Sequence, residues 1–315
     1  MARCINEALP QEVFGVIFEE HAKLQWKAPL IDGRVCRQWR RTILRSPRAW
    51  AYLEIGHKFE SAPSKLLQWL DRSGSAPLHI KAINWTWDVE EILNQHCKRI
   101  QSISLYDPSF AFLENRSFPI LQSLTINRLN ISTPVIRWSA CGAMSALLSF
   151  RASNISMDAL PSNIFPPLRV LVLSTVDNCD SIIRNSYHSL TSLMLSWISL
   201  SDTSESLEFP SLRFLSLYRV KNIKHRMNVP TLTTYHESYG MEGESFPMSL
   251  PSLIEYGIYR VDNNKSPFSV TTLHQCYPNI SRFSVRTHPR YLKLFLQSLS
   301  RQPTAPGWGG QRMGP

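Results

Sequence analysis

The chain has 315 residues, of which 43% are hydrophobic and 18% are charged. This balance predicts a folded globular protein and excludes general disorder, because enough apolar surface is available to offset the entropy lost on folding. The net charge is +10, and no run of 18 apolar residues occurs, so the sequence predicts no membrane-spanning helix.

Two short amphipathic helices are the first predicted elements, and both lie between residues 9 and 50. Pro10 suits a first helical turn, and Glu12 lies where the helix dipole favours a negative charge. Apolar residues at helical spacing predict one apolar face for each helix, and each face must be covered by the rest of the chain or by a partner. These residues are Val13, Ile17 and Phe18 in the first helix, and Val35, Trp39 and Ile43 in the second.

The spacing of three short motifs in this segment resembles that of the F-box family. The motifs are Leu9-Pro10-Gln11-Glu12-Val13, Val35-Cys36-Arg37-Gln38-Trp39-Arg40 and Ser46-Pro47-Arg48-Ala49-Trp50. The resemblance implies docking onto a Skp-type adaptor and, through it, onto the cullin of a ubiquitin ligase. The adaptor contacts that it implies are Leu9, Pro10, Val13, Ile17, Val35, Cys36 and Trp39. A proline and a glycine at positions 29 and 33 predict that the family's middle helix is short or distorted here.

A repeated pattern follows, in which an apolar residue is followed by further apolar residues three and five positions later. Successive units begin 20 to 27 residues apart. Their first residues are Ile100, Leu121, Leu147, Leu168, Leu190, Leu212, Leu232, Leu253 and Ile280, and Leu78 and Ile80 mark one earlier unit. The pattern predicts one short parallel strand in each unit, with its apolar residues buried against the neighbouring units.

These units resemble leucine-rich repeats, and especially the degenerate repeats of fungal F-box proteins. Proline precedes the first residue of several units, as a strand-initiating corner requires. The ninth position lacks the usual asparagine or cysteine and carries Leu129, Val176, Ile198, Val220 and Val261. The predicted fold is therefore α/β, a small N-terminal helical F-box followed by a curved, leucine-rich-repeat-like solenoid with a parallel β-sheet.

The predicted domain organisation has four parts. Residues 1–55 form the F-box-like helical domain, and residues 56–77 form a linker-like or helical connection. Residues 78–300 form the solenoid, and the proline- and glycine-rich residues 301–315 form a disordered tail. Glu237 and Ala152 occupy positions where a large aliphatic residue is expected. A charge at such a position must be paired or solvated, so we expect a bulge or a bend there.

The third, fifth and seventh positions of each strand point outward, onto the face that repeat proteins use for their partners. Early units carry mainly serine and threonine there, whereas later units carry aromatic and basic residues. The predicted target-binding residues are Trp197, Phe214, Tyr218, Tyr259, Arg260, Arg282 and Arg286. Their rings could equally fold onto neighbouring strands and only cover the sheet, and the sequence leaves both alternatives open.

The sequence contains no motif typical of an enzyme active site. It contains no glycine-rich phosphate loop, no pair of histidines spaced around a glutamate, and no nucleophile elbow. We therefore expect no catalytic residue, no metal and no cofactor. Six scattered cysteines form neither a disulfide framework nor a zinc motif, which indicates a reducing compartment, the cytoplasm or the nucleus.

Taken together, the two resemblances imply a substrate-recognition subunit of a cullin-RING ubiquitin ligase. A repeat scaffold that binds partners without ubiquitin transfer is the alternative. The arginines between residues 34 and 48 also admit binding to nucleic acid. That interpretation is less favoured. The same segment places Val35, Trp39 and Ile43 on an apolar face, so its arginines are expected on the solvated side.

Overall fold

The computed structural model has an α/β fold with a large parallel sheet of 11 strands and few helices. The described residues are 9–56, 63–83, 87–106, 112–114, 116–128, 142, 144–156, 165–200, 206–220, 227–238, 250–259 and 277–286. The chain divides into two compact units. The first holds residues 1–168 and 176–185, and the second holds residues 169–175 and 186–315. None of the helices in the described ranges has the length and apolar character that crossing a membrane requires.

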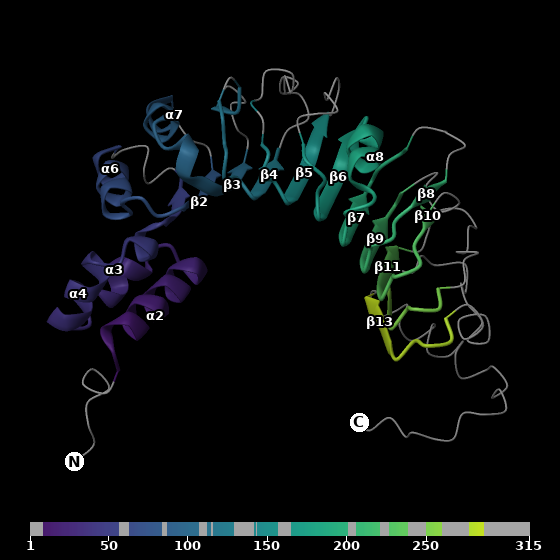
Figure 1. Ribbon diagram of the computed structural model, residues 1–315, viewed down its shortest axis with the longest axis horizontal. Helices are drawn as coiled ribbons and strands as arrows, with labels where there is room; N and C mark the ends of the chain where they lie inside the picture. The colour runs from purple at the N-terminus through teal and green to yellow at the C-terminus, as the bar shows by residue number, and fades with distance from the viewer. Residues whose placement is uncertain are drawn as a thin grey trace, which may run out of the picture. The chain divides into compact units, whose positions relative to one another are not determined.

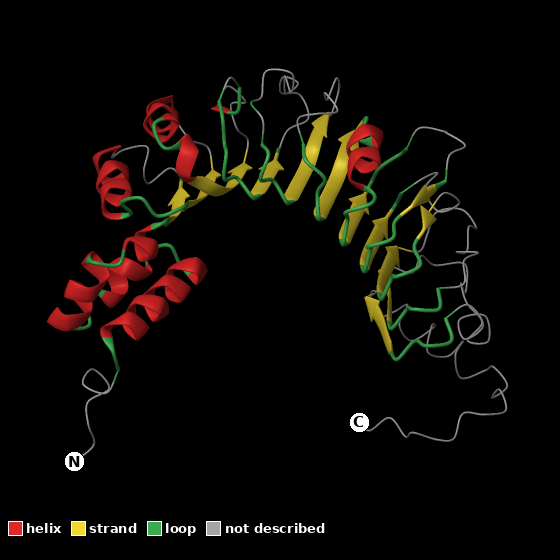
Figure 2. Cartoon of the chain, viewed as in Figure 1, coloured by secondary structure: helices red, strands yellow, loops and turns green. Residues whose placement is uncertain are grey.

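The strands of this sheet follow one another in chain order (Figures 1 and 2), and their pairings within the described residues are parallel. Its strands are β1 (Tyr52–Ile55), β2 (Leu78–Ile83), β3 (Ile100–Tyr106), β4 (Ser123–Asn127), β5 (Ser149–Ser156), β6 (Val170–Asp177), β7 (Ser192–Ser196), β9 (Phe214–Tyr218), β11 (Thr234–Ser238), β12 (Glu255–Tyr259) and β13 (Arg282–Arg286). The strand predicted for each repeated unit, and the earlier one at Leu78, is confirmed. Strand β1 was not predicted, and it lies inside the range that the sequence assigned to helices. A separate pair of short strands consists of β8 (Leu207–Glu208) and β10 (Met227–Asn228).

Helices are concentrated in the first unit (Figure 2). They are α2 (Gln11–Leu24), α3 (Ala28–Asp32), α4 (Arg37–Leu44), the 3-10 turn η1 (Pro47–Trp50), α6 (Pro63–Arg72), α7 (Trp87–Asn94) and the 3-10 turn η2 (Cys97–Arg99), while α8 (Asp180–Ser186) ends where the two units meet in the chain. The short middle helix expected near Pro29 is confirmed as α3, which has 5 residues. His21 Nδ1 lies 2.9 Å from Asp32 Oδ2 and ties α2 to α3.

The core of the helical segment is aromatic. The Trp39 ring lies 5.7 Å from the Phe14 ring and 5.2 Å from the Phe18 ring. The apolar face predicted from Val13, Ile17 and Phe18 is divided in the structure, because Phe18 is 1% exposed whereas Val13 is 39% and Ile17 43% exposed. Phe14 and Phe18 are four residues apart and together form the inward face, which leaves Val13 and Ile17 on another side of α2.

The second predicted face, of Val35, Trp39 and Ile43, is also corrected. Helix α4 begins at Arg37, because Cys36 is its N-cap and Cys36 Sγ accepts a hydrogen bond from Trp39 N. Val35 therefore precedes the helix and is 59% exposed, whereas Ile43 is buried. Trp50 closes the segment, since its Nε1 donates to Ile43 O at 2.9 Å and its ring packs 4.8 Å from that of Trp69 in α6.

A proline turn introduces four strands of the second unit, β9, β11, β12 and β13. In Phe209-Pro210-Ser211-Leu212, Leu212 N donates to Phe209 O, which is a β-turn with proline at its second position. The same hydrogen bond precedes the strands at Leu232, Leu253 and Ile280. Side chains after these prolines then link successive units through the proline carbonyls. Thr231 Oγ1 donates to Pro210 O at 2.8 Å, Ser252 Oγ to Pro230 O at 3.0 Å, and Asn279 Nδ2 to Pro251 O at 2.6 Å.

Glu237 is paired inside the second unit. The Tyr235 hydroxyl donates to Glu237 Oε2 at 2.8 Å, and the Tyr256 hydroxyl donates to Glu237 Oε1. The bulge expected there is wrong, because the pairing of β11 with β9 and with β12 continues through Glu237 without a register shift. Burial, followed by the charge of Glu237, raises the pKa of Tyr235 well above its ordinary value of 10.0.

Replacing Tyr235 by phenylalanine should flatten the dependence of stability on alkaline pH. The unfolded chain ionises this tyrosine near its ordinary pKa, whereas the folded chain keeps the proton, so its contribution is fully present below the unfolded pKa and is lost as pH rises towards the folded value. Urea unfolding of wild type and Tyr235→Phe between about pH 8 and 11 measures this difference. Parallel curves for the two proteins would contradict the pairing described here.

Four consecutive repeats share a left-handed residue at their eighth position. These residues are Asn154, Thr175, Trp197 and Arg219, with φ between 52° and 55°. Asparagine tolerates this conformation, and in the first unit Asn154 Nδ2 also donates to Arg128 O at 2.7 Å. A β-branched threonine is strained there, because its Cβ substituents crowd the backbone.

Thr175→Gly should therefore stabilise the protein by about 1 kcal/mol, since glycine adopts positive φ without this strain. Thr175 is exposed, so little packing is lost. Ser174→Gly is the matched control, and it should destabilise by roughly 0.5–1 kcal/mol because glycine weakens a regular strand. Chemical denaturation of the three proteins measures both values. Equal destabilisation by the two glycines would show that no strain is stored at Thr175.

Candidate functional site

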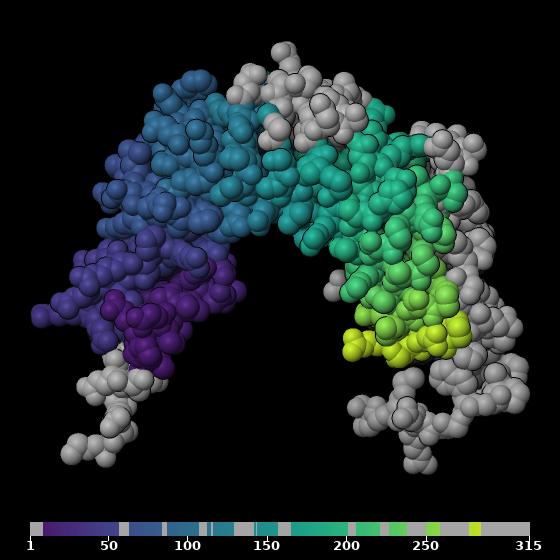
Figure 3. All heavy atoms as spheres, viewed as in Figure 1, coloured from purple at the N-terminus to yellow at the C-terminus, as the bar shows by residue number. Residues whose placement is uncertain are grey.

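Exposed apolar side chains are concentrated on the helical segment of the first unit. Of the sixteen large apolar side chains that are exposed among the described residues, nine lie between residues 9 and 44. We call these nine the N-terminal apolar surface: Leu9, Val13, Val16, Ile17, Leu24, Leu30, Ile31, Val35 and Leu44. Helices α2 to α4, which carry most of them, form the purple end of the space-filling view (Figure 3). Exposed apolar side chains gathered in this way are typical of protein–protein interaction sites.

Helix α2 can present this surface because it is apolar on two sides. Phe14, Phe18 and Ala22 are spaced by four residues and supply the buried side. Val13, Val16 and Ile17 follow the same helical spacing and remain exposed. The helix therefore keeps its core contacts whether or not a partner covers the second side.

Five of the seven predicted adaptor contacts belong to exposed positions: Leu9, Pro10, Val13, Ile17 and Val35. Cys36 and Trp39 are only partly exposed, because Cys36 caps α4 and the ring of Trp39 packs on α2. The structure thus gives both residues a structural role. The sequence analysis overlooked Val16, although its position three residues after Val13 is a signal that could have identified it.

A second candidate surface lies in the second unit, at the ends of β7 and β9. The Arg219 guanidinium carbon lies 4.0 Å from the centre of the Trp197 ring, and the Tyr218 ring lies 5.8 Å from Trp197. We call these three residues the Trp197 cluster. Trp197 remains 50% exposed, so the cluster offers an aromatic surface with a positive charge beside it. Trp197 N also donates to Tyr218 O at 2.7 Å, which fixes the backbone beneath the rings.

Arg219 was missed by the sequence analysis. It occupies the eighth position of its repeat, as Trp197 does in the preceding repeat, and both have positive φ. Equivalent positions of successive repeats lie side by side, so this shared register was the available signal.

Phe214 behaves differently from Trp197. Its ring meets the His236 ring of the neighbouring strand edge to face, with 5.3 Å between centres. His236 Nε2 lies 3.5 Å from Glu255 Oε1, and a Cβ at Gly257 would lie 2.5 Å from His236 Cδ2, so the imidazole also covers the next strand. Both alternatives left open by the sequence therefore occur, since Phe214 covers the sheet whereas Trp197 stays accessible.

The remaining predicted target-binding residues are placed only in part. Arg282 is exposed on β13. Tyr259 and Arg286 are paired in register between β12 and β13, but their side chains lie outside the described part of the chain. Arg260 lies wholly outside it.

Groups suited to catalysis or metal binding are sparse in the described ranges. No group of three His, Cys, Asp or Glu side chains there could hold a metal ion. Burial raises the pKa of Cys179 to about 12, and burial also raises the pKa of Cys97, so neither thiol is activated as a nucleophile. Tyr52 and His79 stack with 4.5 Å between ring centres, and burial lowers the pKa of His79. These two line a cavity of about 290 Å³ with Glu19, Arg48 and Gln101.

Comparison with known proteins returned no match, either to a family model or to a curated protein. The N-terminal apolar surface and the Trp197 cluster are therefore the two candidate functional sites.

Proposed function

We propose that the protein is a substrate-recognition subunit of an SCF-type cullin-RING ubiquitin ligase. The observation that carries the proposal is the N-terminal apolar surface, which lies on a small helical segment joined in one chain to regularly repeated parallel strands. In this proposal the helical segment is an F-box that binds a Skp-type adaptor, and through it a cullin. The repeats form a curved, leucine-rich-repeat-like solenoid that binds a target protein.

The repeated features of the second unit support the solenoid assignment. Strands β9, β11 and β12 each follow a proline turn, bury the first, fourth and sixth positions of their repeat, and hydrogen-bond to the next strand in constant register. A stack in which every unit contacts only its neighbours has these properties. Val176 and Ile198, at the ninth position, are buried and take the place of the asparagine of regular leucine-rich repeats, whereas Val220 is half-buried.

The proposed contribution to ubiquitin transfer is proximity. The protein itself catalyses no bond change, and it raises the effective concentration of a target lysine near the conjugating enzyme. It acts in the cytoplasm or the nucleus, where the ubiquitin ligases of this class work. A partner that covers the exposed valines and isoleucine of α2 would gain apolar burial at a preformed surface.

Replacing Val13 and Ile17 by serine should weaken adaptor binding by at least about tenfold, because two half-exposed apolar side chains would no longer be buried by the partner. Both side chains lie outside the aromatic core, so the variant should keep its unfolding midpoint. Co-purification of the full chain with a Skp-type adaptor, followed by titration, measures the effect.

Leu67→Ser/Trp87→Ser is the matched control, since these exposed apolar residues lie on α6 and α7. It should bind the adaptor as wild type does. If wild type and the Val13→Ser/Ile17→Ser variant both fail to co-purify with the adaptor, the ligase proposal fails. A repeat scaffold that binds partners without ubiquitin transfer then becomes the better account.

Target binding is expected at the Trp197 cluster. Trp197→Ala/Tyr218→Ala should reduce target capture by roughly thirtyfold or more, because buried aromatic residues at binding hot spots contribute about 2 kcal/mol or more. Ser102→Ala/Ser104→Ala changes half-exposed serines in the first unit and should have little effect. Proximity labelling under proteasome inhibition, with adaptor binding as the control for folding, measures both. Loss of labelling in the serine variant alone would place target binding in the first unit instead.

A further inference from the structure

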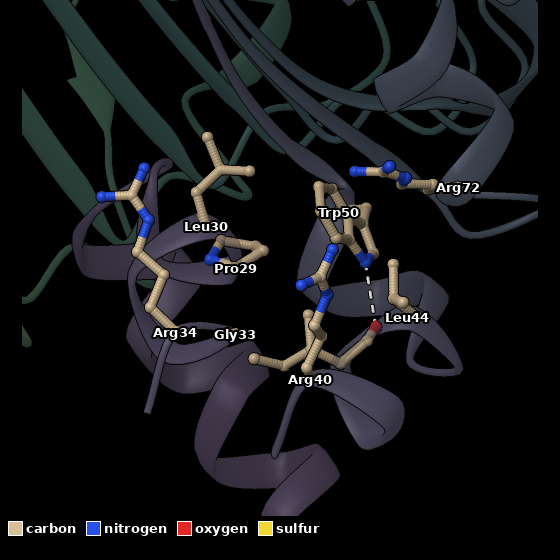
Figure 4. Close-up of a pocket in the computed structure, with 9 residues that line it drawn as sticks. Pro29, Leu30, Gly33, Arg34, Arg40, Leu44, Trp50 and Arg72 are labelled. Atoms are coloured by element: carbon tan, nitrogen blue, oxygen red, sulfur yellow. Dashed lines mark hydrogen bonds between the residues drawn. The ribbon is translucent and has the colours of Figure 1, made fainter. Parts of the chain in front are cut away.

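A basic pocket opens on the helical segment, away from α2. It has a volume of about 260 Å³ and is lined by Pro29, Leu30, Gly33, Arg34, Arg40, Ile43, Leu44, Trp50 and Arg72. These residues come from α3, α4, η1, α6 and the segment between α3 and α4, and none of them comes from α2. Figure 4 shows Arg40 and Arg72 near Trp50, with Arg34 beside Leu30 across the opening.

The pocket is positive, and none of the described carboxylates neutralises it. Three of its described lining residues are arginines, and none is acidic. Within the described part of the chain, no carboxylate forms an ion pair with Arg34, Arg40 or Arg72. The surrounding sequence adds to the charge, since residues 34–53 include six arginines and no acidic residue.

The remaining lining residues of the pocket are apolar. Leu30 and Leu44 are exposed at its opening, and Pro29 and Ile43 are buried behind them. Trp50 is only 2% exposed, its Nε1 is bonded to Ile43 O, and Arg72 covers its ring at 4.5 Å. The indole is thus closed to stacking with a base, which argues against a nucleic acid as the occupant.

Arginine guanidiniums bind carboxylate and phosphate groups in paired hydrogen bonds, and leucine side chains at a rim bury an apolar neighbour of such a group. We propose that this pocket docks an acidic segment of a partner protein, with a carboxylate or phosphorylated side chain between the arginines and an adjacent apolar side chain against Leu30 and Leu44. Charge complementarity selects this occupant. The pocket contains no residue of α2, although Leu30 and Leu44 belong to both surfaces. The proposal therefore does not depend on adaptor binding by the exposed side of α2.

The test uses the full chain and a fluorescein-labelled peptide of alternating glutamate and leucine, followed by fluorescence polarisation. Arg34→Ala/Arg40→Ala removes two guanidiniums from the pocket. Arg37→Ala/Arg41→Ala is the matched control, because it removes the same charge from the same segment at exposed positions outside the pocket. The pocket variant should weaken peptide binding at least about tenfold, and the control should weaken it by less than about threefold.

Three further probes test the stated chemistry. A glutamate and serine peptide should bind more weakly than the glutamate and leucine peptide, and a phosphoserine and leucine peptide should bind at least as tightly. Equal loss in the two arginine variants would overturn the proposal, since the charge of the segment would then act without the pocket. It would also be overturned if a single-stranded oligonucleotide of equal charge bound more tightly than the peptides, with a steep dependence on salt. Thermal unfolding of both variants separates these outcomes from a loss of fold.

Discussion

The inward side chains of each strand can be buried only by those of the strands beside it. In the second unit this constraint is met by a backbone ladder, in which Arg213 N donates to Thr191 O and Thr233 N donates to Arg213 O, at 3.0 Å in both cases. The ladder fixes the register at the start of each strand, so the same positions face inward in every repeat. The outward positions are fixed by the same register, which is why residues far apart in sequence, such as Trp197 and Arg219, share one surface.

The irregular repeats of this chain bury their inward positions with different side chains from those of regular leucine-rich repeats. Apolar residues fill the ninth position, and side chains that follow the turn prolines supply the links between units through proline carbonyls. A carboxyl group at an inward position is tolerated for a related reason. Tyr235 and Tyr256 bring a hydroxyl to each oxygen of Glu237, so its burial leaves no acceptor without a donor.

Sequence periodicity predicted the strands well because each repeat carries its own signal. It missed β1, since Tyr52–Ile55 is short and lies before the first recognisable unit. It also did not separate the inward from the outward apolar residues of the first helix, and it placed Val35 on a helix that begins at Arg37. Helix α2 is apolar on two sides, and only its packing against Trp39 shows that Phe14 and Phe18 are the inner pair. The basic pocket could not be predicted either, because Arg72 reaches Trp50 from a separate helix.

The aromatic core of the helical segment decides what its outer surface can do. Because Phe14, Phe18 and Trp39 already pack together, Val13, Val16 and Ile17 do not have to be buried for α2 to fold. A partner that covers them meets an ordered surface, and it avoids most of the entropy cost of coupled folding. Core residues and binding residues are also different at the basic pocket. Ile43 and Trp50 support its walls, while Arg34 and Arg40 remain at its opening. Substitutions at either surface can therefore change binding without removing the contacts that hold the segment together.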